Sequence, residues 1–165
     1  MTQQTSTDRF QKEIHTFLEE TFEKVHGIYL DKGTSFLETL AGVTPEEASR
    51  RAAPSSGSVA AHVRHVSYYL SVLQQALRGE TLGKLNWREI WEQDRPVSAE
   101  EWRVRVDELR AELASLRALL EAPATWERDD AVGEMMAVVV HTAYHLGAVR
   151  QALTVIREKS AAGGA

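Results

Sequence analysis

The spacing of apolar residues along the chain predicts helices, and no stretch shows the strict alternation typical of a strand. Over residues 7–40, apolar side chains recur every three or four positions, which places them on one face of a helix. We expect this first helix to begin at a cap formed by Thr7 or Asp8 and to continue as far as Leu40, with Gly33 as a kink. Its apolar positions are Phe10, Ile14, Phe17, Leu18, Val25, Ile28 and Tyr29.

Capping residues mark the starts of the next two helices. Thr44 begins a Thr-Pro-Glu-Glu sequence in which proline takes the first helical position and the second glutamate closes a capping box. A short helix should therefore run to about Arg51. Residues 52–58, Ala-Ala-Pro-Ser-Ser-Gly-Ser, have the composition of a turn. Ser58 at the end of this turn is a suitable cap for a second long helix through Leu77.

A long connection follows over residues 81–97. It contains Gly83, Pro96 and two tryptophans, Trp87 and Trp91, spaced as i and i+4. This mixture indicates a loop that includes one or two helical turns. Connections of this length are often functional.

Two further long helices complete the pattern. Ser98 begins a Ser-Ala-Glu-Glu capping box and a third helix that ends at Pro123. Asp129 or Asp130 caps a fourth helix, which ends before a tail of small residues from Ala161 onward. The fourth helix is the most apolar around its circumference, so we expect it to be the most enclosed of the four.

The predicted architecture is therefore all-α, a four-helix bundle with a long crossover loop between its second and third helices. The length suits one well-buried core, so we expect a single domain over residues 1–165, with residues 1–6 and 160–165 as disordered tails. In such bundles, metal and cofactor sites are built from side chains that project inward from facing helices.

Composition narrows the chemistry available to this chain. Its net charge is −5, and the basic residues between positions 103 and 110 are interleaved with acidic ones, as on a solvated helix face. We therefore expect no nucleic-acid partner. The absence of cysteine excludes thiolate ligands, so a transition-metal site must use His, Asp or Glu. No apolar segment is long enough for a membrane span, and none forms a secretory leader, which favours a cytoplasmic protein without a membrane partner.

Histidines supply the candidate chemistry. His141 and His145 stand four residues apart in the most continuously apolar stretch, so they lie on one helix face about 6 Å apart along the axis and can reach one metal ion. Chance alone also produces such a pair, and a catalytic site normally has a third protein ligand. The second predicted helix offers His62 and His65, three residues apart on one face. His65 is the preferred ligand, and His62 replaces it if the helix register is shifted.

These residues resemble the DinB/YfiT-like metalloenzyme superfamily. Its pattern places one histidine seven residues after the serine that begins the second helix, the spacing of Ser58 and His65 here. A His-x-x-x-His pair in the last long helix corresponds to His141 and His145. The resemblance covers nearly the whole chain and implies a four-helix bundle in which these three histidines bind a metal. Leu146 stands where an arginine often follows the second histidine, so no role of that arginine is carried over.

Other polar and aromatic residues receive more ordinary interpretations. We expect His62 to be a polar residue near the site or at the bundle surface, and His15 and His26 to be surface or boundary residues. Glu134 is interpreted as a solvated residue at a helix start rather than a ligand. Two interpretations stay open for four aromatic residues, as a pocket wall or as ordinary core residues: Tyr69, Tyr144, Trp87 and Trp91.

Three neutral imidazoles leave a bound ion its full charge, so it would acidify a water or polarise a thiol. Imidazole suits several divalent transition metals, of which Zn or Ni is our first expectation.

The resemblance implies a metal-dependent enzyme acting on a small molecule. Its activity would be that of an S-transferase or isomerase with a low-molecular-weight thiol cosubstrate, such as bacillithiol or mycothiol, or that of a hydrolase. The alternative is a non-catalytic helical-bundle binding protein in a stress response. Exposed faces of such bundles often pair, which favours a homodimer, and catalytic residues beyond the metal ligands are unknown.

Overall fold

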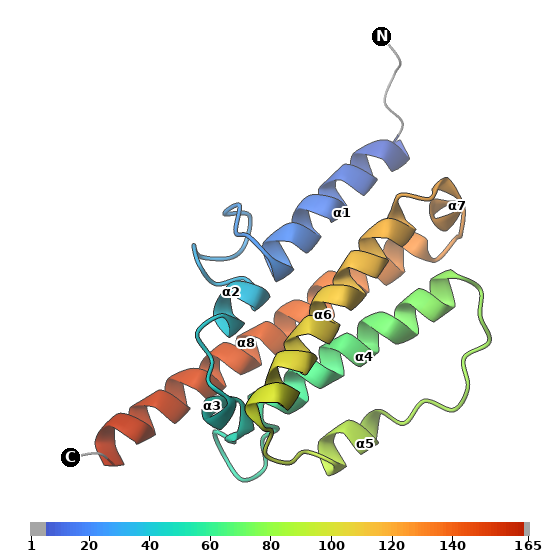
Figure 1. Cartoon of the computed structure of the whole chain (residues 1–165). Helices are drawn as coiled ribbons and strands as arrows, with labels where there is room; N and C mark the ends of the chain where they lie inside the picture. Colours follow the sequence, from blue (N-terminus) through green and yellow to red (C-terminus); the bar gives the residue numbers. More distant parts are fainter. Residues whose placement is uncertain (1–5, 164–165) are drawn as a thin grey trace.

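A computed structural model describes residues 6–163, and within that range the chain is helical with no strand (Figure 1). The all-α prediction is confirmed. One isolated antiparallel bridge joins Arg51 to Ser58. Residues 1–5 and 164–165, most of the predicted tails, lie outside the described residues. The helices are α1 (Ser6–Phe22), α2 (Phe36–Leu40), α3 (Pro45–Ser49), α4 (Val59–Leu77), α5 (Trp87–Glu92), α6 (Ala99–Leu120), α7 (Pro123–Trp126) and α8 (Ala131–Gly163).

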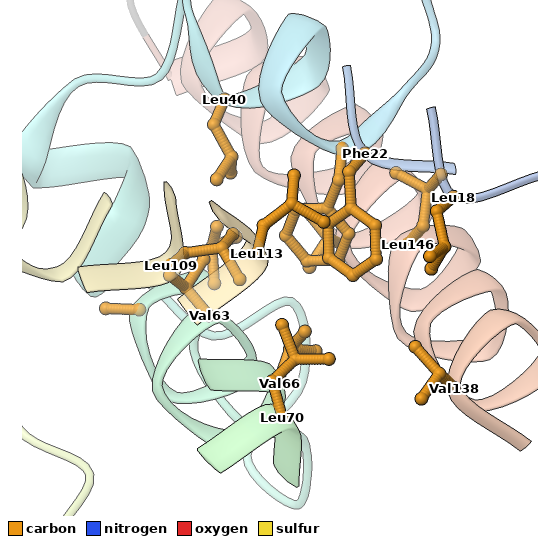
Figure 2. Packing of buried hydrophobic residues seen from close by; sticks show 14 of the residues in the cluster. Leu18, Phe22, Leu40, Val63, Val66, Leu70, Leu109, Leu113, Val138 and Leu146 are labelled. Carbon is orange, nitrogen blue, oxygen red and sulfur yellow. The ribbon is translucent and has the colours of Figure 1, made fainter. Parts of the chain in front are cut away.

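Four long helices, α1, α4, α6 and α8, enclose the core. Helix α4 packs against both α6 and α8, and α1 packs against α8. Figure 2 shows how their apolar faces meet, with Phe22 from α1, Leu70 from α4 and Leu113 from α6 among the buried side chains. Full burial of each such side chain contributes about 1.5–3 kcal/mol. None of the described helices combines the length and apolarity that a membrane span requires.

The capping residues act as predicted at three helix starts. The hydroxyl of Ser58 accepts a hydrogen bond from the Ala61 backbone N–H at 3.1 Å, which fixes the first turn of α4. Both Thr44 and Ser98 form complete capping boxes, at the starts of α3 and α6. Each such cap contributes about 1 kcal/mol, because it satisfies backbone donors that the helix itself leaves unpaired.

The first helix is shorter than predicted, ending at Phe22 rather than near Leu40. The buried carboxylate of Glu20 holds the chain that follows in a loop, and both Gly27 and Gly33 adopt positive φ, +83° and +78°. Burial alone would raise the pKa of Glu20, but the hydrogen bonds that its carboxylate accepts from backbone N–H groups lower this pKa to about 2. These donors are His26, Ile28, Tyr29 and Leu30.

Helix α8 also departs from the prediction, since it is not enclosed on all sides. Its neighbours cover one face and leave a row of apolar side chains in solvent, 45–71% exposed, formed by Val132, Met136, Val140 and Tyr144. The prediction that α8 is enclosed on all sides, made from apolar residues around its whole circumference, is therefore wrong. The helix continues to Gly163, so residues 160–163 are helical where a tail was predicted, in keeping with the high helix propensity of Ala161 and Ala162.

Candidate metal centre

Helices α4 and α8 bring four histidines into one cluster. His62 and His65 come from α4, and His141 and His145 come from α8. The Nε2 atoms of His65 and His141 lie 3.0 Å apart, and the Nδ1 atoms of His62 and His145 lie 2.9 Å apart. The i, i+3 and i, i+4 spacings place each pair on one helix face, and packing of α4 against α8 brings the two faces together.

Three of these histidines have the arrangement that a metal ion requires. His65, His141 and His145 each offer a ring nitrogen, and the three nitrogens lie within 4.8 Å of one another. Nitrogens bound to one zinc at about 2.0–2.1 Å are about 3.3 Å apart, which is close to the His65–His141 separation. The second ring nitrogen of His65, Nδ1, is buried without a hydrogen-bond partner among the described residues. The donor set and its spacing therefore fit a divalent transition metal.

The protonation state of the cluster also suits a cation. Burial, reinforced by the neighbouring histidines, lowers the pKa of His65 to about 4 and that of His145 to about 3. Burial also lowers the pKa of His141 and that of His62, although the nearby Asp94 carboxylate partly opposes the shift at His62. All four imidazoles are thus neutral near pH 7 and keep a lone pair available, which metal binding requires.

Aromatic rings cover the cluster on several sides. The α5 tryptophans pack against the α4 histidines, with ring centroids 5.7 Å apart for Trp87 and His65 and 5.0 Å apart for Trp91 and His65. Tyr69 stacks on His141 at 4.0 Å, and Tyr144 meets His145 at 5.0 Å. Each of the four aromatic residues singled out in the sequence therefore lies beside a histidine ring, but Tyr69 also packs against the hydrophobic core and Tyr144 is largely exposed.

Asp94 fastens the end of α5 to the start of α4. Its carboxylate accepts hydrogen bonds from the Ser58 backbone N–H at 3.0 Å and the Ser58 hydroxyl at 2.6 Å, and it pairs with Arg51 at 3.0 Å. Gly57 leaves the space that Trp91 occupies, since a Cβ there would stand 2.6 Å from the indole ring. The tryptophan cover thus depends on one buried carboxylate and one glycine.

His62 lies near the site, the first of the two positions expected for it, because its Nδ1 is 2.9 Å from Nδ1 of His145. The signal for this position was its three-residue spacing from His65, which places both on one helix face. His15 and His26 lie outside the cluster, beside Glu121 at 3.5 Å and Glu19 at 2.9 Å.

Glu134 is not part of the histidine group, but it is less solvated than predicted. One of its carboxylate oxygens is buried without a partner among the described residues, while the other lies 3.6 Å from Arg128. Burial raises the pKa of Glu134.

Comparison with known proteins supports the resemblance seen in the sequence. A model of the DinB superfamily matches residues 31–149, which span α2 to most of α8 and include all four clustered histidines. No curated protein and no solved structure matches the chain. Because the matched segment covers well over half of the sequence, the chain belongs to the DinB superfamily.

Proposed function

We propose that this protein is a metal-dependent enzyme whose ion is held by His65, His141 and His145. The observation that carries the proposal is the convergence of three neutral imidazole nitrogens within 4.8 Å. Zn or Ni fits an all-nitrogen donor set best. Such an ion, when bound, would supply Lewis acidity toward a thiol or a water molecule.

The chain's own residues favour thiol transfer or isomerisation over hydrolysis. Hydrolysis benefits from a general base close to the attacking water, and no carboxylate belongs to the histidine group among the described residues. The nearby Asp94 is already engaged with Ser58 and Arg51. A low-molecular-weight thiol can lose its proton to solvent, so its sulfur attacks an electrophile without a dedicated base. Trp87 and Trp91 would keep water away from the reacting atoms.

Metal analysis tests the first part of this proposal. Protein purified without an affinity tag and supplemented with Zn or Ni is expected to hold about one ion per chain, the occupancy of a single three-ligand site. Replacement of both His65 and His141 by alanine should abolish that binding, while far-ultraviolet circular dichroism confirms that the helices persist. Unchanged metal binding in the double variant would contradict the site.

A thiol panel tests the second part. With a reactive aryl halide as electrophile, the thiol sulfur forms a C–S bond, the halide leaves with the bonding electrons and the thiol proton goes to solvent. The folded His145→Ala variant should lose this conjugation. Activity that survives the change would exclude the transferase. Metal binding without any turnover would favour the alternative, a non-catalytic binding protein in a stress response. The small-molecule substrate and the homodimer stay predictions.

A further inference from the structure

Three arginines from separate segments line a cavity at the end of α5. Arg64 comes from α4, Arg95 from the loop before α6, and Arg105 from α6, and the cavity they share has a volume of about 560 Å³. This volume lies within the range of about 300–1,000 Å³ typical of small-molecule sites. Arg64 directly precedes His65, so this cavity and the histidine cluster adjoin the same turn of α4.

Two of these guanidinium groups form no ion pair with the described residues. Arg95 pairs with Glu101, but Arg64 donates only to the neutral side-chain amide of Gln93, at 3.2 Å. The half-buried Arg105 has no hydrogen bond or ion pair with any described residue. Burial lowers the pKa of Arg105, and the charges of Arg64 and Arg95 lower it further, while the carboxylates of Glu101 and Asp94 partly oppose this shift. A guanidinium nevertheless stays protonated in a protein.

The acidic residues around the cavity are already occupied. The carboxylate of Asp94 is 2% exposed and is bound by Ser58 and Arg51, and Glu92 pairs with Arg88 at 2.7 Å. Arg64 and Arg105 thus line the cavity without an ion pair of their own, and the more distant charges of Glu101 and Asp94 offset only part of the repulsion that Arg105 experiences from Arg64 and Arg95. A guanidinium presents its N–H groups as a planar fork that matches the two oxygens of a carboxylate or a phosphate.

We propose that this cavity binds the carboxylate or phosphate group of a small anionic molecule through Arg64 and Arg105. The group would lie between the two guanidinium forks, and Gln93, at the rim, would orient Arg64. The site is separate from the histidine centre and does not depend on the proposed function. An anion bound here would place the rest of its molecule beside α5, close to the tryptophans that cover the histidines.

Calorimetric titration of the full-length protein with inorganic phosphate and, separately, with citrate tests the proposal. We expect saturable 1:1 binding of one or both, and affinity lowered on the order of tenfold or more in Arg64→Gln and Arg105→Gln, since each loses a charged hydrogen bond. The matched control is Arg103→Gln, also on α6, whose exposed side chain pairs with Glu100 and Asp107 and should leave affinity unchanged. Repetition after EDTA treatment should give the same affinity.

Thermal unfolding separates a binding role from a structural one. Without added anion, Arg105→Gln should unfold at the same or a higher temperature than the parent protein, because it removes repulsion and breaks no pair. Phosphate or citrate should raise the unfolding temperature of the parent protein but not of this variant. Binding of phosphate alone would identify the ligand group as a phosphate, and binding of citrate alone would identify it as a carboxylate. Failure of both anions to bind, or equal binding in Arg64→Gln, Arg105→Gln and Arg103→Gln, would overturn the proposal.

Discussion

The histidine cluster and the arginine cavity each bring several basic side chains together beside α4, but the side chains are neutral in the first and charged in the second. Histidine can release its proton, so crowding and burial leave neutral rings with free lone pairs, as the lowered pKa values of His65 and His145 indicate. Arginine cannot release its proton, so Arg64 and Arg105 keep their charges. Close packing of basic side chains therefore suits the histidine cluster to a cation and the arginine cavity to an anion.

Removal of one histidine ligand should separate the two sites most clearly. We expect His145→Ala to weaken Zn or Ni binding by more than about 100-fold, because loss of even an outer partner of a ligand costs on the order of 10- to 100-fold. Phosphate or citrate affinity should stay unchanged. Competition with a chromogenic chelator measures the metal affinity, and His15→Ala, outside the cluster, is the control. Equal metal affinity in the two variants would show that His145 is not a ligand.

Addition of a methyl group at Gly57 should disturb the cover over the histidines. A Cβ there would meet two atoms of the Trp91 ring at 2.6 and 2.9 Å, so the indole must move. We expect Gly57→Ala to lower the free energy of unfolding by about 1–3 kcal/mol, as overpacking does, and to shift tryptophan fluorescence to longer wavelength.

Gly83→Ala is the matched control for Gly57→Ala, since a Cβ at residue 83 has nothing within 4 Å. Urea unfolding and the emission spectrum measure both variants. Equal unfolding free energies and equal emission spectra of the two variants would mean that the Trp91 ring does not pack against Gly57.

Removal of the buried charge of Asp94 tests how much this carboxylate contributes to the attachment of α5 to α4. Asp94→Asn keeps the shape of the side chain but removes the ionic pair with Arg51, so we expect a loss of about 1–3 kcal/mol in the free energy of unfolding. Glu92→Gln breaks a surface pair with Arg88 and should cost at most about 1 kcal/mol. Chemical unfolding measures both variants, and a larger loss in Glu92→Gln would contradict the role of Asp94.

The last test concerns pH. The folded-state pKa values of His65 and His145, about 4 and about 3, lie below the ordinary value of 6.5, so the unfolded chain binds more protons below pH 6.5. The free energy of unfolding of the metal-free protein should therefore fall as pH falls from 6.5 toward 5. Each histidine contributes up to about 1.4 kcal/mol per pH unit, while the arginines contribute nothing in this range.

Urea unfolding after EDTA treatment, at several values between pH 7 and pH 5, measures this dependence. His65→Gln should reduce the slope because it removes one titrating group. A parent protein whose stability does not change over this range would refute the assignment of depressed histidine pKa values.

Local signals in the sequence predicted much of this molecule. The caps at Ser58 and Ser98 and the period of the apolar residues predicted α4 and α6, since both depend on neighbouring residues. The end of α1 was missed because Glu20 acts on a loop several residues away. Arg105 was interpreted as part of a solvated helix face because its nearness to Arg64 depends on how α4 packs against α6. Contacts between distant segments have no local signature. Histidine spacing indicated the candidate metal centre because each pair lies within one helix, and the family resemblance selected His65 as the third residue.

The attachment of α5 also has a consequence for local opening. A helix of six residues is too short to be stable by itself in water, so it persists through its contacts with α4 and the Asp94 carboxylate. It can therefore detach as a unit while α4 and α8 stay folded, at a free energy below that of global unfolding. Backbone amides of residues 87–92 should exchange with deuterium sooner than those of α4. Such opening would uncover the side of His65 that Trp87 and Trp91 contact.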